Sequence, residues 1–329
     1  MADLRDMERL RASFRSRDGL YQRTGEAPER RVSATACRAA YATALAAATV
    51  LAAAAPWPDG WADAPLRRGL ALDAAATLVV YGFSLRADNS SVYDPYWCVL
   101  PLWLLFYWKA EAPGGFWFYE PRETMVLCCV WAWAWRFFLF VPWEGWTVGL
   151  AREDWRYHDL RAKLGRGYWG FSLASLHLTP TLLVYGALAP AARVVLAGSD
   201  APPLNRLDAV ALVCVVASLA LEAAADETLR RHRAAGKTAT CVAGLWGRSR
   251  HPNYCGECLF WASLSLFALA ADRLTPALAA GPAAMCLFFR LASVPLMDQR
   301  SLARRPDYAR ATRGLPALVP SLRRRAHRD

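Results

Sequence analysis

Long apolar runs separated by short charged segments are the main pattern along this chain. A helix needs about 20 apolar residues to cross the hydrocarbon core of a bilayer. Segments that approach this length lie at residues 37–56, 69–85, 95–110, 123–141, 168–190, 207–225, 255–272 and 274–296. The third is short and contains Pro101, and the last carries three prolines and Arg290, so seven spans or a re-entrant segment are alternatives to eight. The pattern predicts an all-α, polytopic transmembrane helical bundle of seven or eight spans.

Composition agrees with a protein embedded in lipid. Of the 329 residues 55% are hydrophobic, 15 are Trp, and the formal charge is +11. The basic residues lie between the apolar runs and at both ends, which favours lipid head groups or an anionic cofactor over nucleic acid. With eight spans, the Arg-rich regions fall on one side of the membrane, so we expect both termini to be cytoplasmic. The membrane would be the endoplasmic reticulum in a eukaryote or the inner membrane in a bacterium.

Charge also suggests the domain boundaries. We expect a polar cytoplasmic arm at residues 1–36, one membrane-embedded domain at 37–322 and a basic tail at 323–329. The nine cysteines follow no regular spacing and lie mostly in or beside apolar runs, which is typical of small hydrophobic residues rather than a disulfide framework. The pattern gives no prediction of the oligomeric state.

A basic segment follows the apolar run that ends near Asp226. The cationic residues that follow within about three helical turns include three candidates for binding a ligand: Arg230, Arg233 and Lys237. Gly236, directly before the lysine, is typical of a turn at the end of a helix. This segment predicts a basic patch at the membrane surface, which would contact either a cofactor or lipid phosphates.

The stretch GLWGRSRHPNYCGE, residues 244–257, gathers polar groups at the start of the next apolar run. The candidates for binding a ligand here are Arg248, Arg250, His251, Asn253 and Tyr254. Pro252 is suited to the first turn of a helix, and Gly256 allows another backbone to approach closely. Helix N-termini and guanidinium groups bind phosphate oxygens, and the amide of Asn253 can recognise a carboxamide or an adenine edge. The alternative is a loop that only contacts lipid phosphates.

Glu257 lies one turn farther into the apolar run. A carboxylate costs free energy there unless it is paired, so one interpretation is a functional residue. The other is a salt bridge to Arg250 or Arg290 that joins two helices. The CGEC stretch at 255–258, with His251 at helical spacing, raises a redox pair or a metal site. Because the sequence has no second CxxC and no matching histidine cluster, we interpret these cysteines as core residues and predict no metal.

Two more polar islands border the apolar runs. In DNSSVYDPYW, residues 88–97, the side chains of Tyr93, Asp94 and Tyr96 are candidates for donating a proton to a substrate carbonyl. The alternative is an interfacial aromatic belt with a capped helix start. In REDWRYHDLR, residues 152–161, charges alternate on a helical period, which predicts a helix lying at the membrane surface.

The stretch at 244–257 resembles the signature GLW-x-x-[ST]-R-H-P-N-Y-x-G-E of the membrane family that contains steroid 5-alpha-reductases and uncharacterised relatives of the DUF1295 type. The similarity extends to residues 226–233 and to VPLMDQRSLARRPDYARATRGLPALVP, and covers residues 88–322. Such enzymes are helical membrane bundles that bind NADPH from the cytoplasmic side. They reduce a carbon–carbon double bond conjugated to a carbonyl in a lipid such as a steroid or a polyprenal. The resemblance implies the same cofactor and a hydrophobic, lipid-like substrate here.

The resemblance also implies roles for individual residues. The residues that match family positions at or near the NADPH pocket are Asp226, Arg233, Asn253 and Glu257. Glu222 stands where steroid reductases have Asn, so that contact is not implied. The Glu and Tyr that bind the substrate carbonyl in those enzymes have no matching motif here. Tyr93, Asp94 and Tyr96 take their place by position only.

Two other classes of function remain open at this point. Isoprenylcysteine and phospholipid methyltransferases share the R-H-P-x-Y-x-G element and an Arg-rich tail, but they bind S-adenosylmethionine. The longer context favours the reductase: GLW before the element, and Asn253, Glu257 and Asp226 around it. A non-catalytic membrane scaffold or lipid-binding protein is the third class, since no catalytic acid is assured by a motif.

Overall fold

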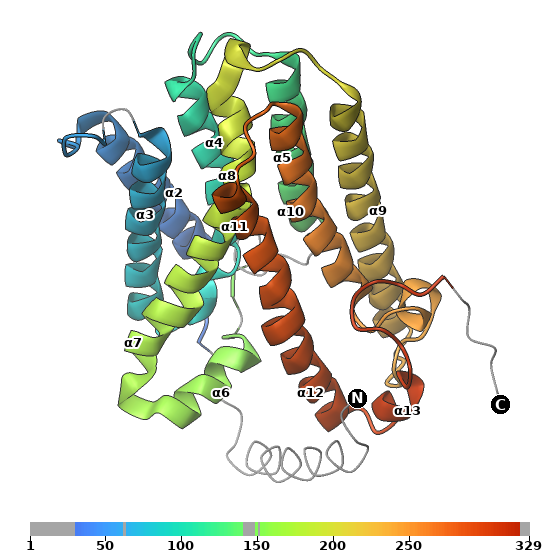
Figure 1. Ribbon diagram of the computed structural model, residues 1–329. Helices are drawn as coiled ribbons and strands as arrows, with labels where there is room; N and C mark the ends of the chain where they lie inside the picture. Colours follow the sequence, from blue (N-terminus) through green and yellow to red (C-terminus); the bar gives the residue numbers. More distant parts are fainter. Residues whose placement is uncertain (1–29, 62–63, 141–148, 151, 323–329) are drawn as a thin grey trace. The chain divides into compact units, whose positions relative to one another are not determined.

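The computed structural model describes residues 30–61, 64–140, 149–150 and 152–322 (Figure 1). Most of the predicted cytoplasmic arm and the whole predicted basic tail lie outside these residues. Within them the chain is helical, and its only paired extended residues are Val32 and Leu150, which form an isolated antiparallel bridge. The predicted all-α class is confirmed.

Each of the eight apolar segments contains a helix. The helices are α2 (Ala34–Ala54), α3 (Pro65–Ala87), α4 (Leu100–Glu111), α5 (Pro121–Phe140), α7 (Tyr168–Phe171), α8 (Thr179–Ala197), α9 (Arg206–Ala234), α10 (Pro252–Ala270), α11 (Pro276–Phe288) and α12 (Val294–Arg304). Short π-helical stretches join α7 to α8 and α11 to α12. Two further helices, α6 (Trp155–Leu164) and α13 (Tyr308–Ala311), lie outside the apolar segments.

Five helical stretches of the described chain are long and apolar enough to cross a membrane. They are Ala34–Ala54, Pro65–Ala87, Trp155–Asp200, Arg206–Ala234 and Pro276–Arg304. Helix α4 has only 12 residues, which agrees with the weakness expected of the segment around Pro101. The chain is therefore a multi-pass membrane protein.

The described chain groups into two compact units. One, here the signature unit, contains Cys214–Phe260 and the residues from Cys286 onward; the other, here the aromatic unit, contains the chain up to Val213 and Trp261–Met285. Helices α9, α10 and α11 each contribute residues to both.

The aromatic unit has a core of large side chains. Helices α2 and α3 run side by side, and α8 packs against α3, α4 and α5 (Figure 1). Fully buried aromatic residues fill the space between helices: Trp108, Trp133, Trp261 and Phe267 belong to the largest buried side chains among the described residues. Two buried ion pairs add to the packing: Lys109 Nζ lies 2.9 Å from the Glu123 carboxylate, and Arg122 donates to Asp208 through two nitrogens at 2.7 and 2.8 Å. Pairing of this kind allows such charges to be buried.

Candidate functional site

In the signature unit, α9 and α10 bring together two of the residues that match the reductase family. Asp226 lies on α9, and Asn253 lies in the first turn of α10, where its Nδ2 donates to Asp226 Oδ1 at 3.2 Å. One turn farther along, Gly256 faces α9. A Cβ atom there would lie 2.3 Å from Glu222 Cγ and 2.9 Å from the Ser218 carbonyl oxygen, so a glycine is required for this approach.

The GLW element is a short 3₁₀ turn over Gly244–Gly247 that contacts α9. The Trp246 indole donates from Nε1 to the Ala225 carbonyl oxygen at 2.8 Å. Gly244 has φ +57°, in the left-handed region that favours glycine. These contacts connect the two separated parts of the family signature, the segment around Asp226 and the segment around Asn253.

Arg250 and His251 both contact Asp298 of α12. Arg250 Nη2 lies 3.0 Å from Asp298 Oδ2, and His251 Nε2 lies 2.8 Å from Oδ1. The Tyr308 hydroxyl donates to the same Oδ1 at 2.5 Å. The Tyr254 ring stacks on the His251 ring, with centroids 5.3 Å apart. These side chains therefore connect α10 with the C-terminal segment, and their contact with a cofactor stays a prediction.

The C-terminal segment pairs with the signature through its backbone. The amide of Arg250 donates to the Pro316 carbonyl at 3.0 Å, and the amide of His251 donates to the Ala317 carbonyl at 3.1 Å. The amide of Ser321 donates in turn to the Arg248 carbonyl at 3.0 Å. This pairing gives a physical reason for the family resemblance to continue into the closing segment of the chain.

The predicted basic residues differ in their surroundings. Arg230 is exposed and paired with Glu227 at 2.6 and 2.8 Å, and Lys237 is exposed beyond the turn at Gly236. Arg233 and Arg305 are close enough for their positive charges to repel each other, and neither forms an ion pair with the described residues. Sequence reasoning missed Arg305, although it lies in the tail that resembles the family.

Glu257 is buried on α10, as predicted. Of the two arginines considered as its partner, Arg250 forms an ion pair with Asp298 instead. The cysteines of CGEC are free thiols. Within the described ranges, no group of three or more His, Cys, Asp or Glu side chains is arranged to hold a metal ion.

A second polar site lies in the aromatic unit, around a small cavity. Its lining includes Tyr93 and Tyr96 from the polar stretch at residues 88–97, Asp73 from α3 and Thr181 from α8. The cavity volume is about 10 Å³, which is room for about one water oxygen. Two of the three residues proposed from the sequence as proton donors thus face the same cavity.

The polar groups around this cavity are only partly hydrogen-bonded. The Tyr93 hydroxyl lies 2.7 Å from Thr181 Oγ1, which lies 2.9 Å from Thr77 Oγ1. The buried Tyr96 hydroxyl has no hydrogen-bond partner of normal geometry in the described chain. Asp73 is 4% exposed, and its carboxylate has no hydrogen bond or ion pair with any described residue. Burying such groups costs free energy, which points to a polar ligand or a chemical role.

Asp94, the third proposed donor, is not among the residues that line this cavity. Its Oδ1 accepts a hydrogen bond from the Tyr157 hydroxyl at 2.5 Å. Burial raises the pKa of Asp94 to about 6, against the opposing effect of the Arg156 charge. Burial also raises the pKa of Tyr93 above its usual value, so this phenol keeps its proton at neutral pH. Sequence reasoning missed Asp73, although a lone carboxylate inside an apolar run is a signal for function.

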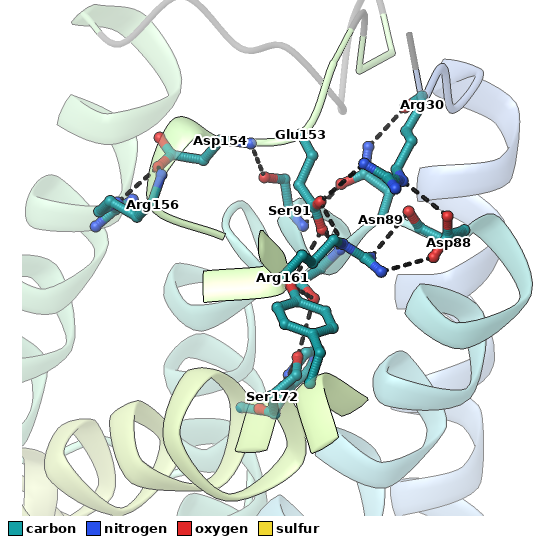
Figure 2. A network of polar contacts seen from close by, with 12 residues as sticks. Arg30, Asp88, Asn89, Ser91, Glu153, Asp154, Arg156, Arg161 and Ser172 are labelled. Atoms are coloured by element: carbon teal, nitrogen blue, oxygen red, sulfur yellow. Dashed lines mark hydrogen bonds and ion pairs between the residues drawn. The ribbon is translucent and has the colours of Figure 1, made fainter. Parts of the chain in front are cut away.

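A network of polar contacts holds the segment that carries Tyr93 (Figure 2). The Glu153 carboxylate accepts from the Ser90 amide at 2.7 Å, from the Tyr168 hydroxyl at 3.2 Å and from Arg161 Nε at 2.7 Å. The Ser90 hydroxyl lies 2.9 Å from the Ser172 hydroxyl. The helix predicted in the segment at residues 152–161 is confirmed as α6. Two residues of this segment also hold the 3₁₀ turn Ser90–Tyr93 in place.

Comparison with known proteins gives one match. The family model described as "Protein of unknown function (DUF1295)" matches residues 80–313. No curated protein and no solved structure matches the chain. The matched segment spans more than half of the chain and includes the signature, Asp298 and Tyr308 of the C-terminal region, and most of the tyrosine-lined cavity. The chain therefore belongs to the DUF1295 family, a steroid 5-alpha-reductase-like membrane family.

Proposed function

We propose that this protein is a membrane-embedded, NADPH-dependent reductase of a conjugated carbon–carbon double bond in a lipid substrate. The observation that carries the proposal is the meeting of Asp73 with Tyr93 and Tyr96 at one buried cavity. In steroid 5-alpha-reductases a Glu and a Tyr bind the substrate carbonyl; no motif in this chain matches them, but Asp73 with the two tyrosines offers the same two kinds of group. The cavity has room for about one oxygen atom. This volume suits the carbonyl oxygen of a substrate.

The chemistry needs an acid at the carbonyl. Reduction of an α,β-unsaturated carbonyl adds a hydride to the β carbon and a proton to the α carbon, through negative charge that develops on the carbonyl oxygen. A phenol or carboxyl that donates a hydrogen bond to this oxygen stabilises that charge. Tyr93 is buried and keeps its proton, so it is suited to this role. The surrounding apolar core excludes water from the reaction.

The signature unit has groups that fit NADPH. The cofactor carries several phosphate charges, and the guanidinium groups of Arg233 and Arg305, which form no ion pair with a described residue, would balance them. Asn253 and Asp226 offer donor and acceptor atoms for a carboxamide or an adenine edge. When bound, NADPH supplies the hydride. The same residues would hold it on the side of the membrane where α9 ends.

An S-adenosylmethionine-dependent methyltransferase is the rival within the same class of membrane proteins. Methyl transfer to a thiolate or an amine needs no acid to stabilise a carbonyl oxygen. Asp73, Tyr93 and Tyr96 would then be buried polar groups without a chemical role, at a cost in stability. The cavity favours the reductase for this reason.

The test is reduction of lipid enones by purified protein. The protein in detergent is incubated with NADPH and, separately, a 3-oxo-4-ene steroid, a polyprenal and a fatty enoyl ester, and the saturated product is measured by mass spectrometry. We expect turnover of at least one substrate. Asp73→Asn and Tyr93→Phe should each lower kcat by about 10²-fold or more.

Matched variants separate this effect from general damage. Asp200→Asn changes an exposed carboxylate, and Tyr107→Phe removes another buried hydroxyl that has no hydrogen-bond partner in the described chain. Both should keep wild-type turnover. If the wild type reduces an enone and Asp73→Asn reduces it equally fast, the cavity has no part in the reaction. Methyl transfer from S-adenosylmethionine, without any reduction, would replace the proposal by its rival.

A further inference from the structure

The cysteines of the CGEC stretch have no part in the proposed reductase chemistry. Cys255 and Cys258 lie three residues apart on α10, a spacing that raised a redox pair within one helix. The structure gives Cys258 a different neighbour, Cys286, which lies near the end of α11. Both cysteines belong to the signature unit, although 28 positions separate them in the chain. The contact therefore joins two helices, and the spacing of the sequence gives no signal for it.

Cys258 and Cys286 contact each other through both of their thiol groups. The Cys286 thiol donates from Sγ to the Cys258 carbonyl oxygen at 3.6 Å. The Cys258 thiol is in turn hydrogen-bonded to the Cys286 sulfur. A disulfide forms without backbone movement only between cysteines whose side chains already point toward each other. The two thiols meet this condition while both are free, as they are in the structure.

The two thiols lie where a small molecule from the bilayer reaches them. Cys258 and Cys286 are both half-buried. The residues after Cys286, Leu287 and Phe288, are 56% and 39% exposed. They belong to the helical stretch Pro276–Arg304, which is long enough to cross a membrane, so apolar side chains exposed on it face lipid. The pair is therefore accessible to a lipid-soluble reagent.

Neighbouring thiols either bind a soft metal ion or react with an oxidant. A zinc site takes three or four protein ligands. Within the part of the chain that the structure describes, no three His, Cys, Asp or Glu side chains are arranged in this way, even though Cys255 lies near the pair. A disulfide, in contrast, needs only two thiols in contact, and hydroperoxides are lipid-soluble oxidants of thiols. We propose that Cys258 and Cys286 form a dithiol site that a lipid hydroperoxide oxidises to a disulfide between α10 and α11.

The reaction uses one hydroperoxide for each pair of thiols. The sulfur of one cysteine attacks the O–O bond, which breaks; the alcohol leaves with the thiol proton, and the cysteine becomes a sulfenic acid. The sulfur of the other cysteine then forms the S–S bond, while the S–O bond breaks and water leaves with the second thiol proton. The two thiols lose two electrons, and the hydroperoxide gains them. The disulfide holds α10 against α11 until a thiol reductant reverses it.

The experiment maps the disulfide in the full-length, reduced protein in detergent, without a substrate or a cofactor. The protein is treated with one equivalent of cumene hydroperoxide, the remaining thiols are blocked with iodoacetamide, and unreduced peptides are mapped by mass spectrometry. We expect the loss of two of the nine thiols and one crosslink, between Cys258 and Cys286. Dithiothreitol should restore both thiols. The oxidised protein should also unfold at a higher temperature, because a disulfide restricts the unfolded chain.

Variants separate this site from general oxidation of cysteines. Cys258→Ser and Cys286→Ser should each abolish the crosslink and the rise in unfolding temperature. Cys214→Ser changes another half-buried cysteine of the signature unit and should keep both effects, as should Cys255→Ser. A crosslink between Cys255 and Cys258 in the wild type would return the redox pair to one helix and overturn the proposal. Crosslinks spread over several cysteines, or oxidation that leaves Cys258 and Cys286 as thiols, would overturn it as well.

Discussion

The hydroxyl groups of Tyr93 and Tyr96 face the same cavity but differ in their partners. Tyr93 is hydrogen-bonded to Thr181 at 2.7 Å, whereas the Tyr96 hydroxyl is buried without a partner of normal geometry in the described chain. Tyr93→Phe should therefore lower the free energy of unfolding by about 1 kcal/mol, while Tyr96→Phe should leave it unchanged or raise it. Denaturant unfolding of both variants measures the difference. An equal loss in both would mean that Tyr96 is bonded within the fold and not kept for a ligand.

Asp94 gives the protein a pH dependence that can be assigned to one residue. The pKa of its carboxyl is about 6 in the folded chain, whereas the ordinary value, which applies to the unfolded chain, is 3.8. Between these two pH values the folded state therefore binds more protons than the unfolded state. Stability then falls as the pH rises from about 4 to about 6 and remains lower above it, by an amount on the order of 1 kcal/mol for this partly exposed group. In Asp94→Asn this contribution to the difference in unfolding temperature between pH 5 and pH 7.5 should vanish. An unchanged pH profile would show that Asp94 titrates alike in both states.

At the scale of elements, the contact between α9 and α10 depends on Gly256. Because a Cβ atom there would approach Glu222 and the Ser218 carbonyl to within 3 Å, Gly256→Ala should lower the free energy of unfolding by about 1–3 kcal/mol. The same change at Gly82 of α3, where a Cβ atom would meet nothing within 4 Å, should be neutral or stabilising by about 0.5–1 kcal/mol. If both substitutions are tolerated equally, α9 and α10 are not in close contact at Gly256.

For the molecule as a whole, the apolar pattern was enough to predict an all-helical membrane bundle and the place of each apolar helix. It failed to predict α6 as an anchor for the turn before Tyr93, since the contact of Glu153 with Ser90 joins residues 63 positions apart. The resemblance pointed to the segments around Asp226 and Asn253 separately, and the structure shows that the two side chains are hydrogen-bonded to each other. Asp298 and Tyr308 were missed as partners of His251, because nothing in a linear sequence specifies which distant carboxylate a histidine will meet. Asp73 was missed for another reason. The apolar run at residues 69–85 was interpreted from its length alone, and the one charged residue within it was not considered as a functional candidate.

The central claim is that the signature unit binds NADPH, and cofactor-dependent stability tests it without knowledge of the lipid substrate. The unfolding temperature of the purified protein is measured with NADPH and, separately, with S-adenosylmethionine. A ligand at a thousand times its Kd stabilises the folded state by about 4 kcal/mol, which is well within the range of this measurement. The account predicts a rise with NADPH that is reduced in Arg233→Gln and Arg305→Gln but kept in Arg67→Gln, and no rise with S-adenosylmethionine. A rise with S-adenosylmethionine and none with NADPH would contradict it.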